Sequence, residues 1–164
     1  MTTLLETERL MLRSFTEDDL ENLVELDSDP QVMHFLTGGR ATPPEVIQRE
    51  VLPRFLRYDG SSEGFGHWAA IEKATGRFVG WFDFHPPDGS EEPELGYRLL
   101  RSAWGKGYAT EGSRALLRKG FRELDVNRVT AETMAVNIAS RRVMEKVGMR
   151  LVRCRSHTLP HRPG

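Results

Sequence analysis

A loop with two glycines, set between a strand pattern and a helix pattern, constrains the fold of this chain most. Residues 94–100 are predicted to form a strand, and residues 108–125 a helix. Gly105 and Gly107 lie in the loop between them, on either side of Lys106. This order exposes backbone N–H groups at a helix N-terminus, where they can bind an anion. Two glycines also suit a tight strand-to-helix turn without a ligand, so both interpretations stay open at this point.

Known nucleotide motifs do not fit the loop. A dinucleotide fingerprint would need a third glycine where Thr110 stands. A P-loop would need Ser or Thr directly after the Gly-Lys pair, and Gly107 follows it instead. The anion is therefore expected to belong to another class of ligand.

Composition and charge narrow the class of protein. The chain has 164 residues and a formal net charge of −1, which predicts one domain over residues 1–164 and no nucleic-acid partner. No apolar run approaches the ~20 residues of a membrane span, so no membrane partner is expected. The single cysteine, Cys154, cannot form an internal disulfide, and we expect a cytoplasmic location.

The hydrophobic pattern predicts an α+β protein with a mixed, mostly antiparallel sheet. Helices are expected after Thr16 to about residue 27, as a short piece near 30–35, from residue 42 until Pro53 kinks or ends it, and over 108–125 and 138–147. Strands are expected over residues 8–15, 67–73, 78–85, 94–100, 128–135 and 150–159.

Several motifs in a fixed order resemble one family. Residues 94–97 read Glu-Leu-Gly-Tyr, residues 104–111 contain the glycine loop, and residues 137–148 run from an asparagine to a glycine. Together they resemble the GNAT superfamily of acetyl-CoA-dependent N-acetyltransferases. With the opening residues 7–13 they look most like its ribosomal-protein (RimJ/RimL-type) branch. The resemblance covers roughly residues 7–155 and implies the GNAT fold, a twisted sheet flanked by helices, with the family's usual last strand missing here.

The resemblance implies how acetyl-CoA is held, as a cosubstrate and without a metal. Backbone groups near one strand would bind the pantetheine arm, at Tyr97, Arg98 and Leu99, and Asn137 would also bind this arm. The glycine loop would hold the pyrophosphate through the backbone of residues Gly105, Lys106, Gly107, Tyr108, Ala109 and Thr110. Asn137 is equally suited to be an N-cap of the helix that follows it.

The resemblance also implies catalytic roles. Glu94 is the predicted general base, with Glu132 on the neighbouring strand as the alternative, although Glu94 could also be a solvated residue at a turn exit. Many family members use a tyrosine seven residues after the asparagine to protonate the leaving thiolate. Met144 stands there and cannot donate a proton, so Ser140 is the implied substitute. A serine at this place can also bond only to the helix backbone.

We therefore expect an acyltransferase that moves acetyl from acetyl-CoA to a primary amine, which could be a protein N-terminus, a small amine or an antibiotic. The alternative is a non-catalytic acyl-CoA-binding module or sensor. The tail contains Cys154, His157 and His161, but its two prolines and the lack of a fourth ligand argue against a metal site. An uncovered sheet edge near this tail could be covered by a second copy, which would make a homodimer.

Overall fold

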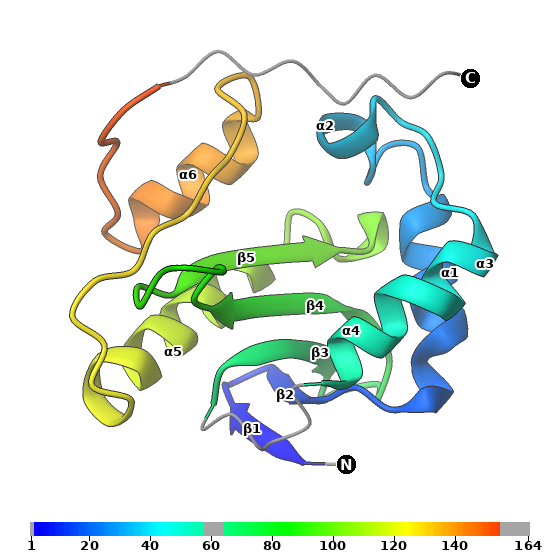
Figure 1. The fold of residues 1–164 in the computed structure, drawn as a ribbon, viewed down its shortest axis with the longest axis horizontal. Helices are drawn as coiled ribbons and strands as arrows, with labels where there is room; N and C mark the ends of the chain where they lie inside the picture. The colour runs from blue at the N-terminus through cyan, green and yellow to red at the C-terminus, as the bar shows by residue number, and fades with distance from the viewer. Residues whose placement is uncertain (1, 58–63, 155–164) are drawn as a thin grey trace.

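An antiparallel sheet forms the centre of the computed structural model, which describes residues 2–57 and 64–154 (Figure 1). Strands that follow one another in the chain are also neighbours in space, in the order β1-β2-β3-β4-β5. All four pairings are antiparallel. The strands are β1 (Thr3–Glu6), β2 (Leu10–Ser14), β3 (Gly66–Glu72), β4 (Phe78–His85) and β5 (Glu94–Leu99).

The predicted α+β class and the central hairpins are confirmed, with one strand added. β1 was not expected from the sequence, and it covers the edge of β2 through pairs such as Glu6 with Met11. The strand predicted over residues 8–15 is shorter and begins at Leu10. Four residues with little alternation give a weak sequence signal, so only the pairing with β2 identifies β1 as a strand.

One face of the sheet is covered by the N-terminal helices. These are η1 (Glu17–Asp19), α1 (Leu20–Ser28), α2 (His34–Thr37), α3 (Pro44–Val46), η2 (Ile47–Val51) and α4 (Leu52–Leu56). The helical segment begins after Thr16 as predicted, and Thr16 and Asp19 form a capping box there. Pro53 does not end its helix, because η2 is a wide π turn just before α4. A π turn gives room to a proline, whose missing N–H and bulky ring would otherwise disrupt a regular helix.

The opposite face carries α5 (Tyr108–Glu123) and α6 (Ile138–Lys146), with the short η3 (Arg101–Ala103) before the glycine loop. α5 packs closely on β4 because two of its residues have no side chain. A Cβ on Gly112 would lie 2.3 Å from the Phe82 ring, and one on Gly120 would lie 2.7 Å from the Phe84 ring. Both rings are fully buried, so these glycines set how close the helix comes to the sheet.

The strand predicted over residues 128–135 is wrong in the structure. The segment touches β5 at a single parallel bridge, between Glu94 and Thr130, and then leaves the sheet. This bridge is the only parallel contact among the described residues, so the expected mixed sheet is antiparallel apart from it. Residue alternation shows that a segment suits a strand, but not whether a partner backbone runs beside it.

The strand predicted over residues 150–159 is also absent from the part of it that the structure describes. Residues 150–154 have no strand pairing and are exposed, and residues 155–159 lie outside the described residues. The predicted helix over residues 138–147 is confirmed as α6. None of its residues is fully buried. In the described chain, the segments before and after this helix, residues 131–137 and 150–154, do not form strands.

No helix in the described ranges is long and apolar enough to cross a membrane.

We predict that Gly112→Ala destabilises the fold, although alanine favours helix formation over glycine by about 1 kcal/mol. The added methyl group would overlap the buried Phe82 ring, and overpacking of a core costs about 1–3 kcal/mol. Urea unfolding should show a net loss of stability, and the double variant with Phe82→Leu should recover part of it. Equal or greater stability of Gly112→Ala alone would contradict this packing.

Candidate functional site

The glycine loop presents an uncapped helix N-terminus. Gly105 and Gly107 have positive φ angles of 73° and 83°, which glycine adopts without strain. Gly107 is the N-cap residue of α5, and no side chain caps the helix. The first bond inside the helix runs from the Glu111 N–H to the Gly107 carbonyl. Within the described chain, the N–H groups of residues 108–110 therefore have no helical partner and are available to an anion.

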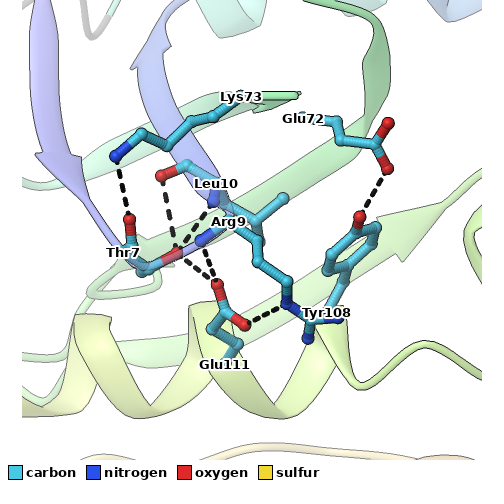
Figure 2. Close-up of polar contacts among 7 residues, drawn as sticks. All are labelled: Thr7, Arg9, Leu10, Glu72, Lys73, Tyr108 and Glu111. Carbon is cyan, nitrogen blue, oxygen red and sulfur yellow. Dashed lines mark hydrogen bonds and ion pairs between the residues drawn. The ribbon is translucent and has the colours of Figure 1, made fainter. Parts of the chain in front are cut away.

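The first turn of α5 is tied to the turn between β1 and β2, as Figure 2 shows. The carboxylate of Glu111 accepts hydrogen bonds from the Arg9 backbone N–H at 2.9 Å and the Arg9 Nε at 2.8 Å. The Thr7 hydroxyl donates to the same carboxylate. Burial raises the pKa of Glu111, but these hydrogen bonds outweigh it and lower the pKa below its usual value. Glu111 therefore stays ionised and holds the helix start in place.

Tyr108 adds a second tie between α5 and the sheet. Its side chain is buried, and its hydroxyl is hydrogen-bonded to the Glu72 carboxylate at the end of β3. The Arg9 guanidinium lies over the ring, 4.5 Å from its centre. The side chain of Tyr108 is thus structural, and only its backbone can reach a ligand at the loop.

The outer edge of β5 opens beyond Leu95. The Leu95 N–H donates to Thr130 at 2.8 Å, so this residue turns its backbone outward. Alternation then places the backbone groups of Tyr97 and Leu99 on the same edge, where the described chain offers no backbone partner. The Trp104 indole donates to the Leu99 carbonyl at 3.0 Å, which fixes the glycine loop to this edge.

Arg98 faces the other way. It is paired with Trp81, so its backbone turns toward β4. Its guanidinium forms an ion pair with Asp27 of α1 at 2.8 Å and lies over the Trp81 ring. Of the three adjacent residues expected at the pantetheine arm, Arg98 is thus the one that the structure keeps away from the open edge.

The start of α6 brings Asn137 and Ser140 near β5. The Asn137 side chain accepts a hydrogen bond from the Ser140 N–H at 3.2 Å, so the asparagine is the N-cap of α6. The Ser140 hydroxyl lies near the Tyr97 hydroxyl, across from the helix. Burial raises the pKa of Tyr97, and the nearby Ser140 hydroxyl only partly opposes this rise. A pair of hydroxyl groups therefore stands beside the open edge, and the tyrosine hydroxyl was missed by sequence reasoning.

Glu94 lies at the beginning of β5, on the face that carries α1 and α4. Partial burial raises the pKa of its carboxyl group, and the negative charges of Glu132 and Asp83 raise it further. His85, its direct partner on β4, opposes the shift. Glu132 is exposed, beyond the bridge at Thr130. Glu94 is therefore the carboxylate that is partly removed from water, as a base near neutral pH needs to be.

Two histidines and an aspartate form a cluster beside Glu94. The His85 Nδ1 is hydrogen-bonded to the Asp83 Oδ1, and the His67 Nε2 lies 3.6 Å from the Asp83 Oδ2. Their ligating atoms lie within 4.8 Å of one another, but a hydrogen bond between Nδ1 and Oδ1 needs a proton there and not a metal. A cavity of about 370 Å³ opens here, lined by Arg54, Arg57, His67, His85 and Asp88. The three residues are spread over two strands, so no contiguous sequence motif reveals the cluster.

A comparison with known families decides the class of protein. The family described as an acetyltransferase (GNAT) domain matches residues 9–150. The chain belongs to the GNAT acetyltransferase family. This GNAT protein is therefore an acyltransferase with acetyl-CoA as its cosubstrate, and the family implies no metal. The finding favours an enzyme over the non-catalytic module considered from the sequence.

Proteins similar to the GNAT protein carry different names and activities. It is 38% identical over 154 residues to the FsC-acetyl coenzyme A-N(2)-transacetylase of Aspergillus fumigatus. The match covers 88% of this chain but only 64% of the length of the fungal protein. A GNAT-family acetyltransferase structure from Bacillus anthracis is 31% identical, with a TM-score of 0.74, and the match covers 89% of this chain and 82% of that one. The structure of RimL, a ribosomal alpha-N-protein acetyltransferase in complex with coenzyme A, has a TM-score of 0.73 with the same coverage, but at 18% identity the likeness concerns the fold alone.

We predict that Glu111→Gln loosens the glycine loop. The amide keeps the shape of the side chain but removes the charge that receives the bonds from Thr7 and Arg9, and a hydrogen bond to a charged group contributes about 1.5–3 kcal/mol. Urea unfolding at pH 7 should show a loss of about 1–2 kcal/mol of stability. Because the folded-state pKa of Glu111 is lowered, the difference from the original protein should shrink as pH falls through that pKa.

The matched control is Glu123→Gln at the other end of α5. Glu123 forms an exposed i,i+4 pair with Lys119, and such pairs contribute at most a few tenths of a kcal/mol. Equal losses in the two variants would contradict the anchoring role of Glu111.

Proposed function

We propose that this GNAT protein transfers the acetyl group of acetyl-CoA directly to a primary amine. The observation that carries the proposal is the open edge of β5. The strand begins at Glu94, its outer edge lacks a backbone partner in the described chain beyond Leu95, and the glycine loop after it leads to an uncapped helix N-terminus. Groups that suit coenzyme A lie along one face of this strand, and groups that suit an amine lie on the other. Holding both substrates at one edge converts a bimolecular step into a local one.

The coenzyme would be held by backbone groups. The N–H groups of residues 108–110 point to the phosphate position at the start of α5, where the helix dipole favours negative charge. The pantetheine arm would pair with the outward backbone groups of Tyr97 and Leu99, as an added strand does. Asn137 accepts its capping bond through Oδ1, which leaves the amide nitrogen to donate to the same arm.

The chemistry follows from the groups at the two ends of the edge. Glu94 would accept, through a water molecule, the proton that the amine nitrogen loses as its lone pair attacks the thioester carbonyl carbon. A new C–N bond forms, and a backbone N–H of Tyr97 or Leu99 would stabilise the negative charge on the carbonyl oxygen. The C–S bond then breaks, and the thiolate would take a proton from the Ser140 hydroxyl, which is replenished through Tyr97.

The acceptor substrate is a molecule with a primary amine, and its kind is left to experiment. The names of two similar proteins point to different acceptors, since one is an N(2)-transacetylase and the other acts on a ribosomal protein, as in the RimJ/RimL branch. The cavity beside Glu94 has the size of a small-molecule site. A panel of L-ornithine, spermidine, tryptamine and a peptide with a free N-terminal serine would separate these classes by release of free thiol from acetyl-CoA. No thiol release with any primary amine would contradict the proposed function.

We predict that acetyl-CoA stabilises the protein in a thermal-shift assay, by about 2.7 kcal/mol at a ligand concentration of 100 times Kd. Gly107→Ala should weaken this binding at least about tenfold, because φ of 83° strains a residue with a Cβ and the loop must change shape. Gly38→Ala is the matched control, since Gly38 has φ of 77° at the C-cap of α2, among the helices on the other face of the sheet from α5. Equal affinities of the two variants for acetyl-CoA would remove the loop from the binding site.

We predict that Glu94→Gln lowers kcat about 100-fold, as removal of a general base does, while the affinity for acetyl-CoA is retained. Steady-state thiol release with the fastest amine of the panel measures the first effect, and thermal shift the second. Glu92→Gln, at an exposed position two residues earlier, should keep the original rate. If Glu94→Gln turns over at the original rate, another group is the base.

A further inference from the structure

We propose that His85, oriented by Asp83, is a second catalytic base that takes a proton from the acceptor amine. This inference rests on the proposed function and adds a second proton acceptor to it. The cluster lies on the same face as Glu94, and His85 lines the cavity.

The geometry fixes the imidazole. His85 ends β4 and is the direct cross-strand partner of Glu94, so their side chains lie next to each other on one face. The Nδ1 of His85 is hydrogen-bonded to Asp83, which places the ring proton of the neutral form on Nδ1. The lone pair of the neutral ring is then on Nε2. A carboxylate that orients a histidine in this way is the arrangement used for general bases in nucleophilic enzymes.

His67 contacts the second carboxylate oxygen of Asp83, Oδ2, while His85 is bonded to the first. The His67 ring stacks on Phe55 at 3.9 Å and lies 5.5 Å from the Trp81 ring. Burial lowers the pKa of His67 to about 4, so it is neutral at physiological pH. A neutral His67 leaves the charge of Asp83 to act on His85. The hydrogen bond to Asp83 raises the pKa of His85, and the charges of Glu94 and Asp88 add to this.

The proton balance of the reaction gives a second acceptor a role. A protonated amine loses two protons when it becomes an amide, one before attack and one from the positively charged nitrogen of the tetrahedral intermediate. The leaving thiolate regains one proton from Ser140, so one proton per turnover goes to solvent. Glu94 can hold one of the two amine protons, and Nε2 of His85 can hold the other. The exposed part of the His85 ring, at the cavity, gives that proton a route to water.

Charged and titratable groups on every neighbouring element act on His85. Arg54 and Arg57 line the same cavity, where a positive charge disfavours a protonated imidazole, while Asp83, Glu94 and Asp88 favour it. The groups are Arg54 on α4, Arg57 just after α4, His67 on β3, Asp83 on β4, Asp88 in the loop after β4, and Glu94 on β5. Because His85 must be neutral to accept a proton, kcat/KM should rise with pH through its raised pKa.

The test compares His85→Gln and Asp83→Asn by the pH dependence of kcat/KM with the fastest amine of the panel. His85→Gln should lose about 100-fold in rate. Asp83→Asn should shift the acidic limb to lower pH, because the hydrogen bond and the charge that raise the His85 pKa are gone. Both should keep the original thermal shift with acetyl-CoA. His34→Gln, at an exposed position on α2, is the matched control and should keep the original pH profile.

Nuclear magnetic resonance of the imidazole nitrogens gives a readout that needs no substrate. In the free protein, neutral His85 should carry its proton on Nδ1, and its pKa should fall in Asp83→Asn. A proton on Nε2, or an unchanged pKa in that variant, would overturn the proposal. So would an original rate and pH profile in His85→Gln. If no amine of the panel is acetylated, the proposed function fails, while the resonances still decide whether Asp83 sets the state of His85.

Discussion

The structure depends on the point at which backbone pairing along β5 stops. Up to Leu95 the strand has a neighbour on both sides, and beyond the bridge at Thr130 the chain leaves it. Backbone N–H and C=O groups that lose a partner have to find another one. Of the outward backbone groups of Tyr97 and Leu99, only the Leu99 carbonyl accepts a hydrogen bond from within the described chain, and the donor is the Trp104 indole. The remaining groups form an edge at which an extended ligand can complete the sheet.

Strand alternation divides the chemistry between the two faces of this sheet. Leu95, Tyr97 and Leu99 turn their side chains toward α5 and α6, where the glycine loop and Ser140 also lie. Glu94 and Arg98 turn theirs toward α1 and α4, together with Asp83 and His85 on β4. Groups suited to the leaving thiol and groups suited to the incoming amine are therefore separated by one layer of backbone.

Local signals in the sequence were sufficient to predict the helices and hairpins, but not the strand pairing at the edges of the sheet. The capping box at Thr16 and the glycines before α5 act within a few residues, and the helices predicted after them are confirmed. The segment around Thr130 has suitable residues for a strand, yet pairing is a property of two segments and cannot be read from one. The candidate site divides in the same way. The glycine loop is contiguous in sequence, whereas the contact of Ser140 with Tyr97 and the cluster around Asp83 join residues of separate elements.

The tie between Glu111 and the turn at Thr7 and Arg9 joins segments about a hundred positions apart. It means that the anion site at the start of α5 is complete only when the N-terminal hairpin has docked. If coenzyme A binds at this helix start, as proposed, its binding and the docking of β1 and β2 are thermodynamically linked, and each strengthens the other by the same free energy. The first residues of the chain would then contribute to coenzyme recognition without touching the coenzyme.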